Sequence, residues 1–347
     1  MKYRGFLVLF SIFLSVPIFA QADLQPAAIV NLIKSEPINV KQLRVEVERR
    51  EKSDGRIYNA EERRAVLDAM INERLVIQAA ERDKITVSEN EVTARIEELK
   101  TQMGEVIRRK PTDAEFATAI RSQFGFEMQA FRDQTRNDLV TQKYLMTKKQ
   151  STFENIKNPT EQDIINTYNL RRSELVRPDT IRFSMIQVAY GADAAAKNKA
   201  RELADRLVRE IGSSPSKFDE IVLRSQAPNS GYQAGDGGYL PRNIQTAQVV
   251  GQDFINTAFN LKQGEVSKVI EGLGGYQIIK VTETYAMKSL ELDDIFQPGT
   301  RITVREYIRN YLLQERRMMA LFEATQELVT ELRAGRTFQI FERNLTW

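Results

Sequence analysis

The sequence predicts an α+β fold, in which a discontinuous and mostly helical domain, built from both ends of the chain, carries an inserted, smaller α+β domain. Amphipathic helical patterns fill most of residues 28–150. Residues 178–285 instead mix β-rich segments with short helices and glycines. A long apolar helical stripe then follows at 304–333 and has no partner inside the α+β segment. We therefore expect the C-terminal segment to fold back onto the first helices.

Capping boxes predict where the N-terminal helices begin. A small polar residue stands three positions before Glu or Gln at Asn39 and Gln42, at Ser88 and Glu91, and at Thr112 and Glu115. One intervening helix has apolar residues at steps of three and four, namely Val66, Leu67, Met70, Ile71, Leu75 and Ala79. A last N-terminal helix is expected at about 127–149, with Phe131, Leu139 and Leu145 on its apolar face. These stripes indicate core packing.

The two ends of the mature chain look incomplete when each is taken alone. A strand is expected at 28–33 and another around Phe338 and Ile340, and a lone strand is unstable by itself. The long C-terminal helix needs a surface for its predicted buried face, which comprises Val304, Ile308, Tyr311, Leu312, Met318, Phe322, Val329 and Leu332. The simplest solution joins the C-terminal helix and strand to the N-terminal helices.

The inserted segment alternates between strands and helices. Strands are expected at 181–188, 266–269 and 276–281, and helices at 192–211, from 216, and at 253–261. Residues 231–238 are rich in glycine. The domain boundaries predicted from these patterns are 1–22 for a signal peptide, 23–158 and 286–347 for the helical domain, and 159–285 for the inserted domain with its lead-in helix, with flexible linkers at 151–159 and 285–301.

The first 22 residues are typical of a secretory signal. Lys2 and Arg4 precede an apolar run from Phe6 to Phe19, and Ala20-Gln21-Ala22 fits a small-x-small cleavage site. A membrane anchor is the alternative, but the run is shorter than the roughly 20 residues that a spanning helix needs. Cleavage would leave Asp23 as the first residue of an exported protein.

Composition excludes several kinds of site. The chain has no histidine and no cysteine, so disulfides, Ser-His-Asp triads, Cys-His dyads and the usual zinc sites are impossible. We expect no metal and no cofactor. Of 50 basic and 47 acidic residues, the signal removes two basic ones, which leaves a mature net charge of +1. That balance gives no electrostatic footprint for nucleic acid.

Linked motifs in 178–285 resemble the parvulin-type (PpiC, or rotamase) prolyl isomerase family. They are Ile181-Arg-Phe-Ser-Met-Ile-Gln-Val188, Ala234-Gly-Asp-Gly-Gly-Tyr239, Phe254-Ile-Asn-Thr-Ala-Phe259, Leu261-Lys-Gln-Gly-Glu-Val-Ser267 and Gly274-Gly-Tyr-Gln-Ile-Ile-Lys-Val281. Leu67 to Val76, Val87 to Val92 and the last helix and strand are similar to SurA-type periplasmic chaperones. SurA itself has two parvulin-like modules, whereas this chain shows one.

The resemblance implies a site whose polar positions have changed. The family usually has histidine where Met185 and Gln277 stand, and Cys or Asp near Pro228. Val250 and Phe254 fall where the family lines its proline pocket, and we expect a binding groove of Met185, Val250, Phe254, Phe259 and Gln277. Because amide rotation needs no proton transfer, these changes predict weak rather than absent isomerisation. No residue is assigned as catalytic.

Three functions remain open on the sequence. The resemblance implies an ATP-independent periplasmic holdase chaperone for unfolded outer-membrane proteins, with a parvulin-like domain that we expect to be inactive. The first alternative is an active peptidyl-prolyl cis-trans isomerase that assists the folding of such proteins. The second is a structural or surface interaction protein that reuses the scaffold. The charge balance predicts no nucleic-acid partner, and because no other apolar run approaches membrane length, we expect no stable membrane insertion after signal cleavage.

Overall fold

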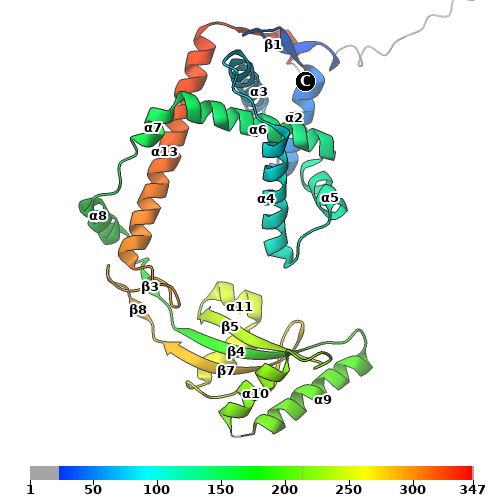
Figure 1. Cartoon of the computed structure of the whole chain (residues 1–347), viewed down its shortest axis with the longest axis vertical. Coiled ribbons are helices and arrows are strands. Elements are labelled where there is room, and N and C mark those ends of the chain that lie inside the picture. The colour runs from blue at the N-terminus through cyan, green and yellow to red at the C-terminus, as the bar shows by residue number, and fades with distance from the viewer. Residues whose placement is uncertain (1–22, 213, 346–347) are drawn as a thin grey trace, which may run out of the picture. The chain divides into compact units, whose positions relative to one another are not determined.

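The computed structural model describes residues 23–212 and 214–345, so the predicted signal peptide lies outside the described residues. The chain divides into a helical unit, Met1–Lys157 with Arg316–Trp347, and a small unit, Asn158–Glu315 (Figure 1). The discontinuous α+β fold is thereby confirmed. The second boundary differs from the expected one, because residues 286–315 pack within the small unit rather than with the helical domain.

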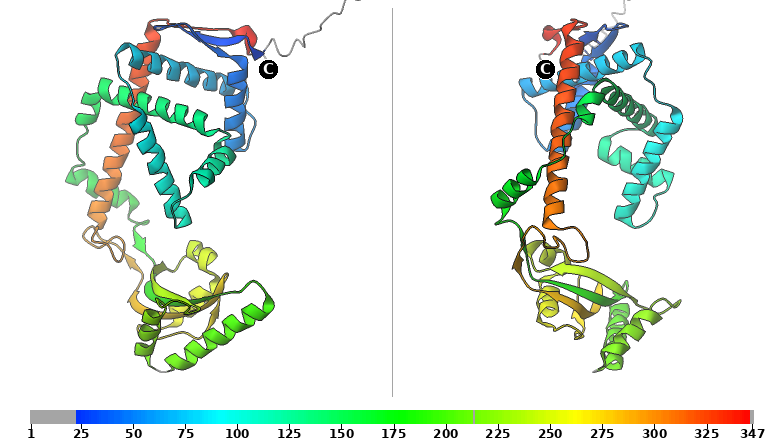
Figure 2. Two further views of the ribbon diagram at one scale, coloured as in Figure 1. Left: turned by 45° about the vertical axis from the view of Figure 1, so that its right-hand side comes forward. Right: turned by 60° about the vertical axis from the view of Figure 1, so that its left-hand side comes forward.

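The helical unit is closed by a sheet that contains both ends of the chain. Its strands are β1 (Pro26–Val30), β2 (Glu36–Asn39) and β9 (Phe338–Ile340), in the order β2-β1-β9. Ala28, Ile29 and Val30 pair antiparallel with Ile340, Gln339 and Phe338. Both views of Figure 2 show the N-terminal strands beside the C-terminal segment. Each terminal strand thus supplies the hydrogen-bonding partner that the other lacks.

Within residues 23–157, six helices complete the described part of the helical unit together with the end of α13. They are α2 (Val40–Asp54), α3 (Ala60–Arg82), α4 (Glu89–Ile107), α5 (Asp113–Phe124), α6 (Met128–Lys148) and α7 (Gln150–Glu154), and α13 spans Val304–Ala334. The three predicted capping boxes form as expected. The proposed linker at 151–159 was partly wrong, because α7 occupies its first half.

Helix α3 is the centre of the helical core. Its buried stripe packs with β1, α2 and the α13 residues Ala324, Leu328 and Leu332. The wholly buried Gln78 side chain accepts hydrogen bonds from the backbone N–H groups of Leu32 and Ile33, at 3.0 and 3.1 Å. The turn after β1 is therefore fixed to α3 by a buried side-chain oxygen that would otherwise lack these two hydrogen bonds.

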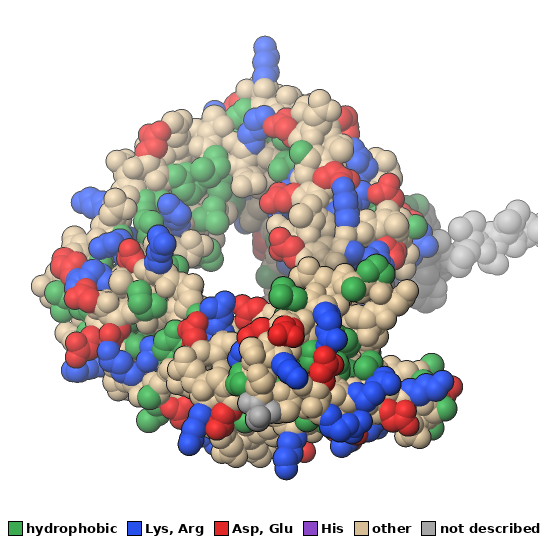
Figure 3. Space-filling view, turned by 60° about the horizontal axis from the view of Figure 1, so that its bottom comes forward, with side chains coloured by type: hydrophobic (Ala, Val, Ile, Leu, Met, Phe, Trp, Pro, Cys, Tyr) green, Lys and Arg blue, Asp and Glu red, His purple; other side chains and the backbone are tan. Residues whose placement is uncertain are grey.

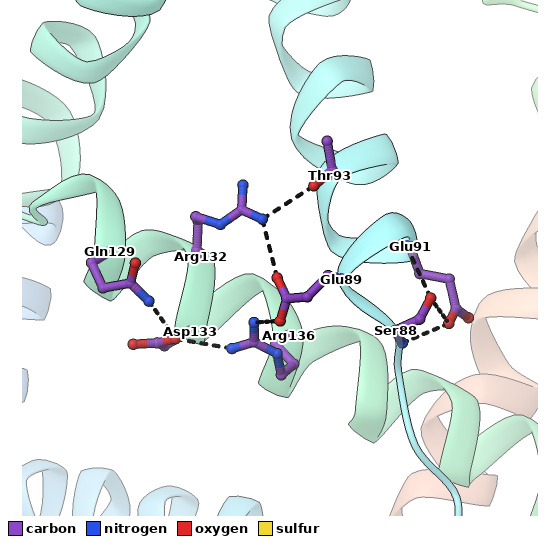
Figure 4. A network of polar contacts seen from close by, with 8 residues as sticks. All are labelled: Ser88, Glu89, Glu91, Thr93, Gln129, Arg132, Asp133 and Arg136. Carbon is purple, nitrogen blue, oxygen red and sulfur yellow. Dashed lines mark hydrogen bonds and ion pairs between the residues drawn. The ribbon is translucent and has the colours of Figure 1, made fainter.

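Charged groups hold α4 against α6. The Glu89 carboxylate, in the first turn of α4, receives a hydrogen bond from Arg132 of α6 at 3.2 Å and a second one from Arg136 (Figure 4). Arg132 also donates to the Thr93 hydroxyl. A separate apolar cluster of α4, α5 and α6, centred on Val92, Ile96, Phe116 and Ile120, packs beside this network. The angle between α4 and α6 is consequently fixed by both polar and apolar contacts.

The small unit is an antiparallel sheet with helices on both faces. The strands β5 (Gln233–Pro241), β4 (Thr180–Ala189), β7 (Gly275–Tyr285) and β6 (Ile270–Glu271) follow in that order. On one face lie α9 (Ala194–Ile211) and α10 (Pro215–Arg224), and on the other lie α11 (Ile244–Val250) and α12 (Gln252–Asn260) (Figure 1). The predicted strand at 266–269 was misplaced, since β6 begins at Ile270.

The remaining part of the small unit is where α13 starts. Helix α8 (Glu161–Arg171) and the strands β3 (Val176–Arg177) and β8 (Lys288–Ser289) surround a core that includes Val304 and Ile308. The expected linker at 285–301 is therefore ordered structure.

The predicted buried face of α13 is only partly correct. Both ends of the helix are buried, but Tyr311, Met318 and Phe322 in its middle are 41%, 59% and 60% exposed.

The surface carries both signs of charge. Figure 3 shows Lys and Arg side chains interspersed with Asp and Glu over the face in view, in keeping with the near balance of 50 basic and 47 acidic residues. Among the described helices, none combines the length and the apolar character that crossing a membrane requires.

Truncation of Leu328 tests whether the C-terminal helix completes the helical core. Leu328 is 4% exposed, so Leu328→Ala should lower the free energy of unfolding of the helical unit by about 2–5 kcal/mol. The exposed neighbour Gln326→Ala is the control and should change it by less than about 0.5 kcal/mol. Urea unfolding followed by circular dichroism measures both. Equal midpoints for the two variants would show that α13 is dispensable for this core.

Candidate functional site

The predicted groove residues come from four elements of the small unit. Met185 lies on β4 and pairs with Ile279 of β7, while Gln277 of β7 pairs with Gln187 of β4. Since directly paired residues of an antiparallel sheet point to the same face, Met185 and Gln277 share the face that α12 covers. Val250 ends α11, and Phe254 and Phe259 belong to α12. Residue types recognised in separate motifs thus meet on one side of the sheet.

The groove is more tightly packed than the sequence suggested. Phe254 is 3% exposed, and its ring meets that of Phe183 edge to face at 5.5 Å between centroids. Met185, Val250 and Phe259 are half-buried against the same cluster. Phe254 therefore belongs to the core beneath the groove, and the other three residues are available at its rim. Pro228 lies apart, exposed in the turn that follows α10.

The side-chain oxygen of Gln277 is buried without a hydrogen-bond partner among the described residues. Gly272 closes over it, because a Cβ atom at that position would lie 2.7 Å from Gln277 Oε1. An unpaired buried acceptor costs stability. None of the five groove residues can titrate, so the groove offers no general acid or base.

A second candidate site is a pocket of about 910 Å³ within the helical unit. It lies among α2, α3, α4 and α6 and the turn between α5 and α6. Its apolar lining consists mainly of Val45, Met70, Leu99, Phe124, Phe126, Phe131 and Leu139. Phe124 and Phe131 stack at 6.4 Å between centroids, and Phe124 and Val45 are 36% and 57% exposed. Large aromatic and aliphatic side chains are therefore open to a ligand.

The two glutamates that line this pocket differ in their surroundings. Glu46 of α2 is paired, since it accepts hydrogen bonds from Arg49 at 2.6 Å and from Arg50 at 2.8 Å. Burial alone would raise the pKa of Glu46, but these hydrogen bonds outweigh it and lower the pKa. Glu73 of α3 is different, because burial raises the pKa of its carboxyl group. Two carboxyl groups on one pocket thus have opposite environments.

Sequence reasoning missed this pocket because it assigned the helical stripes, including Phe131, to the core. One signal was present: Phe124 and Phe126 flank the helix-ending Gly125, where a wholly buried position is hard to form. A second was Glu73, an acidic residue three positions after Met70 of the predicted apolar stripe on this helix.

Phe254→Ala should act on stability before it acts on binding. Removing a ring that is 3% exposed should destabilise the small unit by about 3–5 kcal/mol. Amide hydrogen exchange in β4 and β7 measures that unit separately. Phe259→Ala, at a half-buried position of the same helix, is the control and should have a smaller effect. Unchanged exchange rates in Phe254→Ala would mean that the ring is not part of the core.

Two family models match the chain and cover both units. A SurA-like N-terminal domain matches residues 8–145, and a PPIC-type PPIASE domain matches residues 181–283. The pocket lies in the first region and the predicted groove in the second.

Relatives with curated names include Chaperone SurA of Alcanivorax borkumensis, 26% identical over 78% of this chain and 60% of its own length. Chaperone SurA of Nitrosospira multiformis is 24% identical over 63% of this chain and 46% of its own. Foldase protein PrsA of Clostridium kluyveri is 26% identical over 65% of this chain and 62% of its own. The chain therefore spans about half to three-fifths of the length of these relatives.

Solved structures with some likeness include a Campylobacter jejuni protein described among two SurA-like chaperones, which is 14% identical with a TM-score of 0.38 and covers 91% of this chain and 99% of its own. The structure of PrsA from Bacillus subtilis is 23% identical with a TM-score of 0.30, covering 89% and 93%. TM-scores of 0.38 and 0.30 are too low to establish a common fold. The assignment rests on the two family models, which identify a SurA-like N-terminal domain and a PPIC-type PPIASE domain in this chain.

Proposed function

We propose that the chain is an exported, ATP-independent chaperone that holds unfolded outer-membrane proteins in the periplasm. The observation that carries this proposal is the open aromatic pocket of about 910 Å³ in the helical unit. Unfolded barrel proteins expose strands of about ten residues in which apolar and polar side chains alternate. A pocket with several exposed apolar side chains can accept many such segments, because apolar contact is not directional. The names of the relatives, Chaperone SurA and Foldase protein PrsA, agree with this role.

The parvulin-type domain fits binding better than efficient catalysis. Met185 and Gln277 offer no titratable group, and Gln277 Oε1 is inaccessible within the described structure. The half-buried side chains of Met185, Val250 and Phe259 still form an apolar rim. We propose that this rim contacts clients weakly and that the domain barely accelerates isomerisation.

The second candidate is an active prolyl isomerase. The match to a PPIC-type PPIASE domain favours it, since an apolar groove can lower the barrier by binding a twisted amide. An assay of cis-to-trans conversion of a proline peptide distinguishes the two, because the uncatalysed step takes tens to hundreds of seconds. We expect little acceleration by residues 23–347 and no further loss in Met185→Ala or Gln277→Ala. Robust activity that falls in these variants would establish the isomerase.

Filling the pocket should impair chaperoning. Val45 lines the pocket and is 57% exposed, so Val45→Arg should put a bulky charge into it without disturbing the core. We expect purified mature chain to suppress aggregation of a denatured barrel protein without ATP, and Val45→Arg to require several-fold more protein for the same effect. Light scattering measures both.

The matched control for Val45→Arg is Val106→Arg. Val106 lies on α4, is 83% exposed and does not line the pocket, so the same change there should leave suppression at the wild-type level. If the wild-type chain fails to suppress aggregation, the proposed function is wrong. If Val45→Arg behaves like Val106→Arg, clients bind elsewhere.

A further inference from the structure

Among the described residues, Glu73 forms no ion pair, whereas Glu46 and Glu36 each pair with an arginine. Within the same residues the one hydrogen bond to the Glu73 carboxylate comes from Gln134 Nε2 at 3.4 Å. The same Gln134 amide nitrogen donates to Asp138 Oδ1 at 3.0 Å. One neutral amide group of α6 therefore lies between two carboxylates on the wall of the pocket. A partly buried carboxylate without a cation is unfavourable unless a ligand compensates it.

Two arginines, Arg74 and Arg49, interact electrostatically with Glu73, and each forms an ion pair with another carboxylate. Arg74, next to Glu73 on α3, forms an ion pair with Glu36 of β2. Arg49 of α2 holds Glu46 through two hydrogen bonds, at 2.9 and 2.6 Å. Recruiting Arg74 to Glu73 would leave the half-buried Glu36 without a cation, and recruiting Arg49 would break both of its hydrogen bonds to Glu46.

Of the other basic residues that line the pocket, Arg50 and Arg95 pair with Glu46 and Glu98, and Lys41 is exposed. Among the described residues, none of these cations pairs with Glu73 or Asp138, so both carboxylates are open to a cation of a bound segment.

The apolar part of the pocket favours a cation on an apolar stem. Phe124, Phe126 and Phe131 line the same pocket as Glu73 and Asp138, and ring faces attract cations. A lysine or arginine side chain can bury its methylene groups against such rings while its charged end reaches a carboxylate. A purely aliphatic segment would leave the carboxylates of Glu73 and Asp138 without a cation.

We propose that this pocket selects segments of unfolded chains in which Lys or Arg stands beside aromatic or aliphatic residues, with the cation held between Glu73 and Asp138. This assignment rests on the proposed chaperone function and names the chemistry of its client segments. It also explains why an unpaired acid persists in an aromatic pocket.

The pocket should then respond to pH. The charged groups that line the pocket with Glu73 are Lys41, Glu46, Arg49 and Arg50 of α2, Arg74 of α3, Arg95 of α4 and Asp138 of α6, together with the neutral Gln134. Burial raises the pKa of Glu73, and Glu46 and Asp138 act in the same direction, whereas Gln134 and Arg74 oppose them. Glu73 therefore becomes neutral at a higher pH than an ordinary glutamate as the solution is acidified. Binding of a cationic segment should weaken over that same range.

The test compares two fluorescent peptides on the mature chain. One has a central Lys between two Phe residues. The other carries acetyl-lysine at that position, which keeps the number of residues and the methylene stem and removes the positive charge. Fluorescence anisotropy should give the Lys peptide a Kd about 5- to 10-fold lower. Glu73→Gln or Asp138→Asn should each abolish most of this preference. Glu48→Gln removes the same charge from an exposed position of α2 outside the pocket and should keep it.

A stability measurement separates ligand binding from a structural role. Because the folded state raises the pKa of Glu73, its charge destabilises the fold at neutral pH. Glu73→Gln should therefore keep or slightly raise the Tm. A lower Tm together with an unchanged peptide preference would overturn the inference.

The peptide outcomes also separate the two proposals. Equal binding of both peptides to the wild-type chain, unchanged in Glu73→Gln, overturns the selectivity for cations and leaves the chaperone proposal intact. Absence of binding by either peptide also overturns the selectivity, and the aggregation assay then decides independently whether the chain is a chaperone.

Discussion

The antiparallel pairing of β1 with β9 is the contact on which the helical unit depends. It joins residues near position 28 to residues near position 340, and it places the end of α13 against α3, where Leu328 and Leu332 enter the core. The Arg333 side chain reinforces this junction by donating to Asn72 of α3 at 2.7 Å. A contact of such long range is costly in loop entropy, but the folded small unit between the two ends reduces that cost. The inserted small unit therefore favours the pairing of the two terminal strands.

Closure of the ends fixes α3, and α3 in turn positions the pocket. Its buried stripe faces the core, whereas Met70 and Glu73 face the pocket. The opposite wall depends on α4 and α6, which Glu89, Arg132 and Arg136 hold together. The pocket keeps an unpaired carboxylate and exposed aromatic rings in a unit that is otherwise well paired. Sites that bind ligands commonly retain such unfavourable groups because the ligand compensates them.

Local chemistry made much of the fold predictable. The boxes at Asn39, Ser88 and Thr112 fixed helix starts because each side chain contacts a backbone only three residues away. Strand β5 was missed because its glycines mask any β pattern; at Gly237 a Cβ atom would come 2.3 Å from the Phe183 ring. The burial of Phe254 and the opening at Phe124 depend on tertiary packing. The spacing of apolar residues does not show which part of an apolar helix face stays exposed in the folded unit.

Site-specific photo-crosslinking to an unfolded barrel protein tests most directly whether clients are held by the helical unit. A photoreactive residue would replace Val45 at the pocket, Ile244 on α11 of the small unit, or Val106 outside the pocket, which are 57%, 74% and 83% exposed. Similar exposure makes the three positions comparable. We predict strong crosslinks from position 45, weak ones from 244 and background from 106. Strong crosslinks from 244 with only background from 45 would contradict the account and assign the client to the parvulin-type domain.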